Sequence, residues 1–321
     1  MRLTTYRAAC IGILFLLAAH AVTALEVLSP KSTLPGDAIS ILVSDAPQLS
    51  GARVTLYSAG GTYVASARAF PYAAAQNVQV WVALLGIPST SAPGSYLLKT
   101  VISAGNGDIE RDTPIDIGTR SFRHESIHLD ASLTSLQTED NAIKTQQAEQ
   151  LWHILTSFDP NVVLQTGLFA LPVENPIVTS PYGEQRLFTF AGGGSQPDVH
   201  QGIDLAVPEG TPIHAAGAGK VVYAGSWLMT GNSVVIEHLP GVYSLYYHME
   251  RILVAVGQTV SKGQEIGLVG ATGLATGPHL HWQIEVSGVA VDPLSLVRAG
   301  LLDPSQIVSE TARWQPQQLT R

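Results

Sequence analysis

Cysteine is almost absent from this 321-residue sequence, which contains one, at position 10. A single cysteine excludes a disulfide framework and any metal module built from several cysteines. Charge is also scarce, because Lys+Arg (17) and Asp+Glu (25) make up only 13% of the residues and leave a formal net charge of −8. Without a basic block to hold phosphates, the sequence predicts no nucleic-acid partner. Its 45% of apolar residues nevertheless excludes a disordered chain and is ample for two or three domains.

The sequence also lacks a hydrophobic run long enough to span a membrane. An apolar run from Ala8 to Ala19 follows Arg2 and Arg7, and small residues come after it. About 12 apolar residues fall short of the roughly 20 that a spanning helix needs. We therefore interpret residues 1–24 as a cleaved signal peptide and expect an exported protein with no stable membrane insertion after cleavage. Cys10 would leave with this segment.

Residues 25–120 have the pattern of a β-sandwich. Short alternating segments such as Ile39–Val43 and Val78–Val82 are separated by turn signals such as Gly60-Gly61. Several short strands at regular spacing over about 95 residues predict an immunoglobulin-like (Ig-like) sandwich. The region has no histidine or cysteine and its acids are scattered, which favours a binding or spacer module over a catalytic one.

Residues 121–165 are predicted to form a helical linker. Apolar residues recur at helical spacing from Ala148 to Leu155, within a Gln-rich stretch, and Thr138 is a candidate cap. His124 and His128 are four residues apart, but with no third ligand nearby we interpret them as surface or packing residues. The amphipathic helix directly precedes the next domain, which suggests that this helix and the N-terminal sandwich lie over a cleft there and limit access.

Residues 166–302 are rich in Gly and Val with period-2 alternation, so that a compact all-β domain is predicted, followed by a polar tail at 303–321. The overall prediction is a mostly β chain. Six of the ten histidines fall in this last domain. His214 and His238 among them are interpreted as packing or hydrogen-bonding residues.

The first chemically suggestive motif is His200-Gln201-Gly202-Ile203-Asp204. Histidine and aspartate are good zinc ligands, with bonds of about 2.0–2.2 Å. Four residues of straight strand would separate His200 and Asp204 by roughly 13 Å at Cα, too far to share one ion. The chain must bend between them, and Gly202 permits the bend.

The second motif is His279-Leu280-His281, followed by Trp282-Gln283-Ile284-Glu285-Val286. Strand alternation places Leu280, Trp282, Ile284 and Val286 on one face and the histidines, Gln283 and Glu285 on the other. The two histidines are then about 7 Å apart at Cα, close enough for one metal ligand and one neighbouring catalytic group. Glu285 is either a hydrogen-bonding partner of the site or a solvated acid.

The third motif is Tyr246-Tyr247-His248, at the end of an alternating segment. Period-2 alternation places Tyr247 on one face and His248 with Tyr246 on the other. Alone, a histidine in this position is as well explained by packing as by catalysis.

Together the three motifs resemble the lysostaphin/LytM-type zinc metallopeptidases, whose pattern is H-x-G-x-D, then Y-x-H, then H-x-H. The connecting segments match as well, including Gly210-Thr211-Pro212 and Thr276-Gly277-Pro278, and the likeness extends over about 176–297. The order of an Ig-like domain, a helical link and this domain is similar to that of exported bacterial members of the family.

The resemblance implies that His200, Asp204 and His281 hold one Zn²⁺ ion. It also implies that His248 and His279 share two roles, as general base and as stabiliser of the oxyanion, without saying which takes which. The implied substrate is the peptide cross-link of bacterial peptidoglycan, and the layout favours a D,D-endopeptidase in a periplasm, with secretion or cell-wall association as alternatives. The competing interpretation is a metal-free, non-catalytic LytM-like protein that activates another cell-wall hydrolase. Because the chain keeps all three ligands and both further histidines, the enzyme is favoured.

Overall fold

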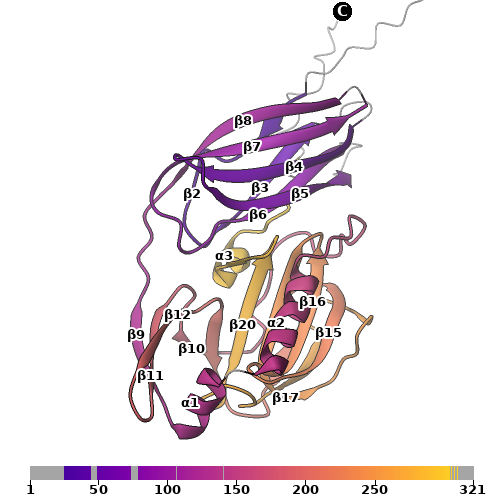
Figure 1. Cartoon of the computed structure of the whole chain (residues 1–321). Helices are drawn as coiled ribbons and strands as arrows, with labels where there is room; N and C mark the ends of the chain where they lie inside the picture. Colours follow the sequence, from indigo (N-terminus) through magenta and orange to yellow (C-terminus); the bar gives the residue numbers. More distant parts are fainter. Residues whose placement is uncertain are drawn as a thin grey trace, which may run out of the picture.

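The computed structural model describes residues 25–44, 49–73, 79–105, 107–139 and 141–303, with residues 305, 307 and 309. Two β domains lie one above the other, with a connector running down one side (Figure 1). The signal-peptide interpretation of 1–24 and most of the tail predicted at 303–321 lie outside the described residues. Within these described parts, no helix is both long and apolar enough to cross a bilayer.

The N-terminal domain is an Ig-like sandwich, as predicted. Its strands pair in the order β1-β3-β6-β5-β4-β7-β8-β2, and the long strand β5 belongs to both sheets. The two sheets β1-β3-β6-β5 and β5-β4-β7-β8-β2 have the pairing order of an Ig-type sandwich. The strands are β1 (Val27–Leu28), β2 (Ser32–Thr33), β3 (Ala38–Ser44), β4 (Leu49–Ser58), β5 (Tyr63–Ala73), β6 (Gln79–Gly86), β7 (Gly94–Ala104) and β8 (Gly107–Ile117).

The connector contains a strand and two helices rather than helices alone. Strand β9 (His124–Leu129) pairs in parallel with β11, a strand about 60 residues further on. Helix α1 (Ala131–Thr138) is capped by Asp130, and helix α2 (Ala142–Leu155) by Asn141, so Thr138 is not the cap. Both caps accept a hydrogen bond from a backbone N–H of the first turn, which satisfies a donor that the helix itself leaves free.

The C-terminal domain is built on one large antiparallel sheet with the main path β10-β13-β20-β17-β16-β15-β18. A smaller sheet, β12-β11-β9, stands beside it. The elements are β10 (Ile177–Ser180), β11 (Gln185–Phe190), β12 (Ser195–Val199), β13 (Ile203–Ala206), β14 (Pro212–His214), β15 (Gly219–Trp227), β16 (Gly231–Leu239), β17 (Val242–Ile252), β18 (Thr259–Val260), β19 (Glu265–Val269), β20 (Leu280–Val286), β21 (Val289–Val291) and α3 (Pro293–Arg298).

The large sheet buries both of its faces. Leu280, Trp282, Ile284 and Val286 of β20 belong to the main core, as their alternation predicts. The opposite face holds Tyr243, Leu245 and Tyr247 of β17, which register with Glu285, Gln283 and His281. Helix α2 covers part of this second face: its Leu155 packs in a cluster with the three β17 residues. Figure 1 shows α2 in front of this sheet, next to β16.

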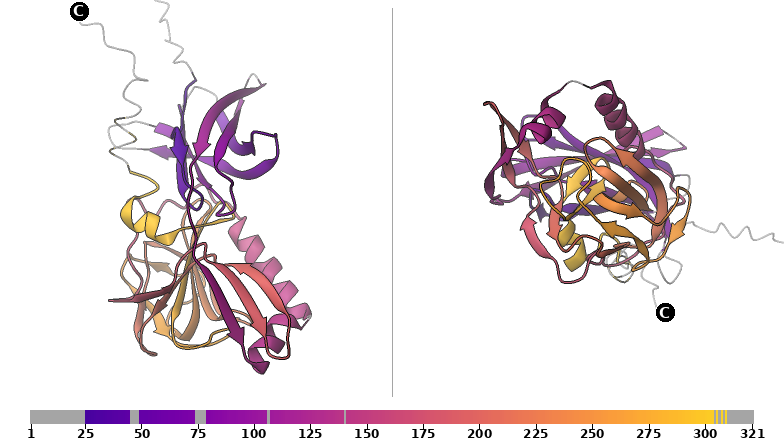
Figure 2. Two further views of the ribbon diagram at one scale, coloured as in Figure 1. Left: turned by 90° about the vertical axis from the view of Figure 1, so that its left-hand side faces the viewer. Right: turned by 90° about the horizontal axis from the view of Figure 1, so that it is seen from below.

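The two domains share a core. Leu42, Val82 and Leu84 of the sandwich belong to the same apolar cluster as Val286 and Val291 of the C-terminal domain. A Cβ on Gly86 of β6 would lie 2.8 Å from the Cβ of Val289, so β6 and the β20–β21 turn meet at the closest approach that a glycine allows. The side view in Figure 2 shows the sandwich seated on the end of the large sheet.

Candidate metal centre

Three strands of the large sheet assemble the site. Strand β13 places Asp204 directly opposite His281 of β20, and β17 places Tyr247 on the other side of His281. His200 lies in the turn just before β13. The turn must bring His200 back over the sheet, and Gly202 is essential to it because a Cβ there would lie 2.6 Å from the Trp282 carbonyl and 2.7 Å from Nε2 of His281. The sequence prediction attributed the bend to the backbone freedom of glycine, but Gly202 is not in the left-handed region. A glycine is needed here because it leaves room for His281.

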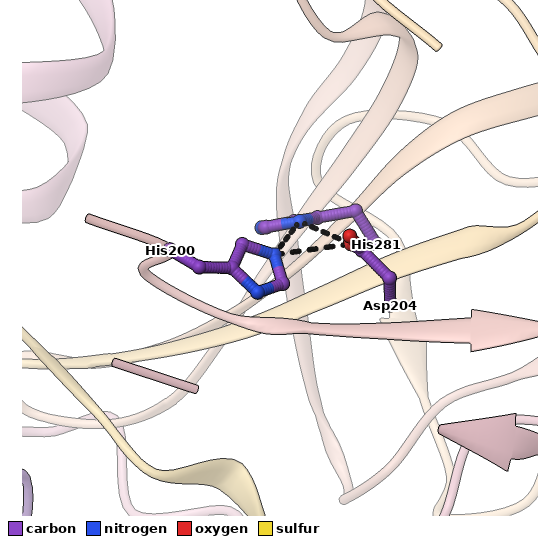
Figure 3. Close-up of side chains that lie close together, drawn as sticks. All are labelled: His200, Asp204 and His281. Atoms are coloured by element: carbon purple, nitrogen blue, oxygen red, sulfur yellow. Dashed lines mark hydrogen bonds and ion pairs between the residues drawn. The ribbon is translucent and has the colours of Figure 1, made fainter. Parts of the chain in front are cut away.

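His200, Asp204 and His281 converge, as the resemblance to the lysostaphin/LytM-type peptidases implies (Figure 3). Nε2 of His200, Oδ1 of Asp204 and Nδ1 of His281 are each 3.0 Å from the other two. His200 and His281 are 2% and 9% exposed. The three atoms thus form a nearly equilateral triangle in a largely buried setting.

Each histidine in the triangle turns a lone pair toward its centre. Nδ1 of His200 lies 3.1 Å from the carbonyl oxygen of Pro181, and Nε2 of His281 lies 3.2 Å from Oε1 of Gln283. Because these oxygens only accept, those nitrogens carry the protons, and Nε2 of His200 and Nδ1 of His281 are free as ligand atoms.

This donor set fits a zinc ion. For bonds of about 2.0–2.1 Å, two ligands of a tetrahedral ion are separated by about 3.3 Å, close to the observed 3.0 Å. Two imidazoles and one carboxylate also leave the fourth position open, as catalytic zinc requires. The chemistry of the ligand atoms and their separations therefore agree with the zinc that the motifs suggest.

Electrostatics keep the ligands in the protonation states that a cation needs. Burial lowers the pKa of His200 to about 4, so that its imidazole is neutral at pH 7. Burial alone would raise the pKa of Asp204, but its close contacts with His200 and His281 outweigh burial and hold the pKa of this carboxyl well below its usual range. Neutral histidine and ionised aspartate are the forms that bind metal.

His248 and His279 lie beside the triangle. Their rings are 4.8 Å apart, and Nε2 of His279 is 3.7 Å from Oδ1 of Asp204. Nδ1 of His248 donates to the carbonyl of Thr272, and Nδ1 of His279 donates to that of Gly277, both at 2.8 Å. The Nδ1 atom of each ring is therefore occupied by a backbone carbonyl.

His248 reaches the site by a departure from strand geometry. Regular alternation would place it on the face of Tyr246, away from His281. Its φ of 61° lies instead in the left-handed region, which few residues other than glycine adopt. This conformation brings the His248 ring to 6.2 Å from that of His281. Such strain, worth about 1–3 kcal/mol, is typical of functional positions.

Sequence reasoning missed Arg186 of β11. Its Nη2 donates to Oδ2 of Asp204 at 2.6 Å and lies 2.7 Å from the hydroxyl of Ser180. Its Nε lies 3.3 Å from Oε1 of Glu184, a fully buried carboxylate that also pairs with Arg123. No local pattern marks Arg186, because β11 meets Asp204 only through tertiary folding.

Glu285 is a buried hydrogen-bonding partner of the site and not a solvated acid. Its Oε1 accepts a hydrogen bond from Nε2 of Gln283 at 2.6 Å, and Gln283 is the partner of His281. Burial raises the pKa of Glu285 to about 7. On the other side of His281, the ring of Tyr247 stacks at 5.3 Å between centroids. The sequence gives no signal for this stacking, since Tyr247 is the variable position of the Y-x-H motif.

The remaining histidines lie outside this group. His238 is fully buried, with Nδ1 2.7 Å from the carbonyl of Ala218 and Nε2 2.7 Å from the hydroxyl of Ser244, which agrees with its predicted structural role. Exposed His128 has Nδ1 3.3 Å from the hydroxyl of Thr189. Neither shares a ligand group with the site.

The site opens into a cleft of about 350 Å³. The connector supplies one wall, with Ile127 and Leu129 from β9 and Leu133 and Gln137 from α1. Helix α2, the element expected to cover the cleft, is not among the lining elements and packs on the neighbouring part of the sheet. The cleft wall is therefore provided by the part of the connector in which no covering role was predicted.

Comparisons with known proteins agree with the geometry. Residues 198–293 match Peptidase family M23. The chain is 37% identical over 142 residues to the DD-carboxypeptidase/endopeptidase Mpg of Neisseria meningitidis, covering 43% of this chain and 31% of the relative. It is 42% identical over 138 residues to the peptidoglycan DD-endopeptidase ShyB of Vibrio cholerae, covering 42% and 32%. The matched part thus spans about a third of the length of these relatives.

The similarity to a solved structure includes both domains. A crystal structure of a peptidase M23 from Pseudomonas aeruginosa is 26% identical, with a TM-score of 0.57, and the match covers 82% of this chain and 94% of that one. Its coverage extends well beyond residues 198–293, so the N-terminal part of the fold is shared as well. The C-terminal domain of the chain therefore belongs to peptidase family M23, the lysostaphin/LytM-type metallopeptidases.

Proposed function

We propose that the chain is a zinc-dependent endopeptidase that hydrolyses peptide cross-links of bacterial peptidoglycan, of the D,D-endopeptidase type. The observation that carries this proposal is the triangle of ligand atoms from His200, Asp204 and His281, each 3.0 Å apart, beside two histidines whose Nδ1 atoms are held by backbone carbonyls. The roles of these five residues are part of the proposal.

In the proposed mechanism the ion would supply Lewis-acid chemistry and the protein's histidines would transfer protons. His200, Asp204 and His281 would hold the zinc ion, which as a Lewis acid would lower the pKa of water. Of His248 and His279, one would accept the proton of the attacking water at Nε2 and pass it to the leaving amine nitrogen as the C–N bond breaks, and the other would hydrogen-bond the carbonyl oxygen on which negative charge develops. The carbonyls of Thr272 and Gly277 hold both rings in the orientation that this requires.

The substrate class is supported by the relatives. Two of those compared are named for activity on D,D bonds, and one of these is named for peptidoglycan. A peptidoglycan substrate lies outside the cytoplasm, which is consistent with the predicted signal peptide and with a periplasmic location. The open cleft beside the triangle gives an extended peptide access to the ligand group.

The alternative is a non-catalytic LytM-like activator of another cell-wall hydrolase. Such a protein has no use for an intact ligand triangle. Here all three ligand atoms converge, and hydrogen bonds to Pro181 and Gln283 fix both histidine ligands. The geometry therefore favours the enzyme.

The deciding experiment is digestion of purified cross-linked muropeptide dimers by the chain without residues 1–24. It is run with and without a chelator, with zinc added back, and beside a His281→Ala variant. We expect conversion of dimers to monomers that the chelator abolishes, zinc restores and the variant lacks; mass spectrometry of the products identifies the bond.

Two results would contradict the proposal. Turnover that persists in the His281→Ala variant would place the chemistry elsewhere. A zinc titration that finds no bound ion, together with no turnover, would favour the activator.

A further inference from the structure

The two carboxylate oxygens of Asp204 have different partners. Oδ1 lies 3.0 Å from the ligand nitrogens of both His200 and His281. Oδ2 points the other way and accepts a hydrogen bond from Nη2 of Arg186 at 2.6 Å. An unrestrained carboxylate can rotate and offer either oxygen, or both, to a metal ion. Here Arg186 determines which oxygen faces the ligand triangle.

Arg186 is itself held on several sides. Its Nη2 is 2.7 Å from the hydroxyl of Ser180, and its Nε is 3.3 Å from Oε1 of Glu184. Strand pairing explains the arrangement, because β10 places Ser180 directly opposite Asp204 on β13. The arginine side chain is only 12% exposed, so it has little freedom to leave. A rigid planar fork of donors suits this task better than the single flexible ammonium of a lysine.

Glu184 reduces the electrostatic repulsion between the Arg186 guanidinium and a cation bound nearby. Its carboxylate is fully buried and pairs with both Arg186 and Arg123, while the hydroxyl of Ser180 donates to it. Charges therefore alternate from Arg123 through Glu184 and Arg186 to Asp204, and the negative charge of Glu184 offsets the repulsion between Arg186 and a bound cation.

We propose that Arg186 is the positioning residue of the metal centre: it engages Oδ2 of Asp204 so that Oδ1 alone faces His200 and His281, and Glu184 fixes Arg186 in that position. The inference rests on the proposed zinc site. It assigns a role to β11, a strand outside the segment 198–293 that matches the family.

The charge of Arg186 and its positioning of Asp204 have opposite effects on zinc affinity, so a substitution of Arg186 can distinguish them. Removing the positive charge of Arg186 would by charge alone strengthen the binding of a cation. Loss of positioning would weaken it, and loss of a residue that orients a metal ligand typically costs 10–100-fold in metal affinity. Weaker zinc binding by an Arg186→Gln chain would therefore identify positioning. The remaining partners of Glu184, Arg123 and Ser180, keep it from being left unpaired in that variant.

The experiment measures the zinc dissociation constant of the chain by competition with a chromophoric chelator, and records the d–d absorption of bound Co²⁺. The variants are Arg186→Gln, Arg186→Lys and Glu184→Gln. The control is Arg298→Gln, which removes an exposed arginine from another buried carboxylate, Asp292, that keeps Arg120. Thermal unfolding of each metal-free chain checks that it is folded.

We expect Arg186→Gln to bind zinc about 10–100-fold more weakly and to change the Co²⁺ spectrum. Arg186→Lys should recover part of the affinity, Glu184→Gln should lose some, and Arg298→Gln should match the original chain. If Arg186→Gln does not fold, Arg186→Lys and Glu184→Gln decide: weaker binding by either folded chain supports the inference. Equal or tighter binding by every folded variant overturns it while the proposed function stands. If the unsubstituted chain binds no zinc, both the role of Arg186 and the proposed function are contradicted.

Discussion

The phenol ring of Tyr247 lies parallel to the imidazole of His281, with 5.3 Å between their centroids and 11° between their planes. On its other side, Tyr247 meets the edge of Trp227 at 6.4 Å. His281, the proposed metal ligand, is therefore held by stacking as well as by its hydrogen bond to Gln283. A buried aromatic ring supports the imidazole.

Replacement of Tyr247 should affect both stability and metal binding. Truncation of a buried aromatic residue to alanine costs about 3–5 kcal/mol, so we expect Tyr247→Ala to lower the free energy of unfolding by that amount and to weaken zinc binding. Tyr247→Phe keeps the ring and should keep the zinc affinity. Urea unfolding and chelator competition measure the two quantities. Equal zinc affinity in all three chains would show that the stacking does not support His281.

Gly202→Ala should damage the metal centre specifically. A Cβ at this position would lie 2.7 Å from Nε2 of His281 and 2.6 Å from the Trp282 carbonyl, so the ring or the backbone must move. We expect a loss of about 1–3 kcal/mol in stability from overpacking and at least a tenfold loss in zinc affinity. Gly51→Ala is the matched control, because nothing lies within 4 Å of a Cβ there. Zinc binding that survives Gly202→Ala unchanged would contradict the close approach.

His238 should make the metal-free chain less stable in acid. Burial lowers its pKa in the folded chain to about 4, below the 6.5 expected when unfolded. Protons therefore bind preferentially to the unfolded chain, and the stabilisation from neutral His238 is complete above pH 6.5 and lost as the pH falls toward 4. At about 1.4 kcal/mol per pKa unit, the loss reaches about 3 kcal/mol.

The measurement is urea unfolding of the metal-free chain at pH 7.5 and pH 4.5, beside a His238→Gln variant. The other buried histidines are common to both chains, so the difference between their pH dependences isolates His238. We expect the variant to lose less free energy between the two pH values. Identical losses would mean that His238 does not contribute.

Leu133, with which α1 lines the cleft, should contribute to substrate binding but not to folding. Leu133 lines the cleft, whereas Leu136 of the same helix does not, and no residue of α1 is fully buried. We expect Leu133→Ala to raise KM for a cross-linked dimer while kcat and thermal stability stay close to their original values, and Leu136→Ala to change none of them. A rise in KM for both variants, or for neither, would contradict a specific contact between Leu133 and the substrate.

Local pattern was sufficient to predict much of this molecule. The alternation in residues 25–120 gave the sandwich, and the faces of Leu280–Val286 are those observed. The meeting of His200, Asp204 and His281 was implied by the family resemblance that their two motifs carry. All of these predictions rest on periodicity and motifs, which are properties of short segments.

The features that the sequence did not show arise from contacts between distant segments. Strand β9 was assigned to a helical linker because its partner β11 lies about 60 residues away. The approach of Arg186 to Asp204 depends on the same small sheet and its neighbours. The position of His248 depends on its own backbone φ of 61°, which strand alternation cannot predict.

Strand β20 carries His281 near one end, and at the other end its turn to β21 presses Val289 against Gly86 of the sandwich. The two domains are therefore not independent units, because they are in direct contact next to this strand. Any larger residue in place of Gly86 would press a side chain against Val289, beyond the far end of the strand that carries His281. A transplanted sandwich would therefore have to keep a glycine at this position in order to leave that strand undisturbed.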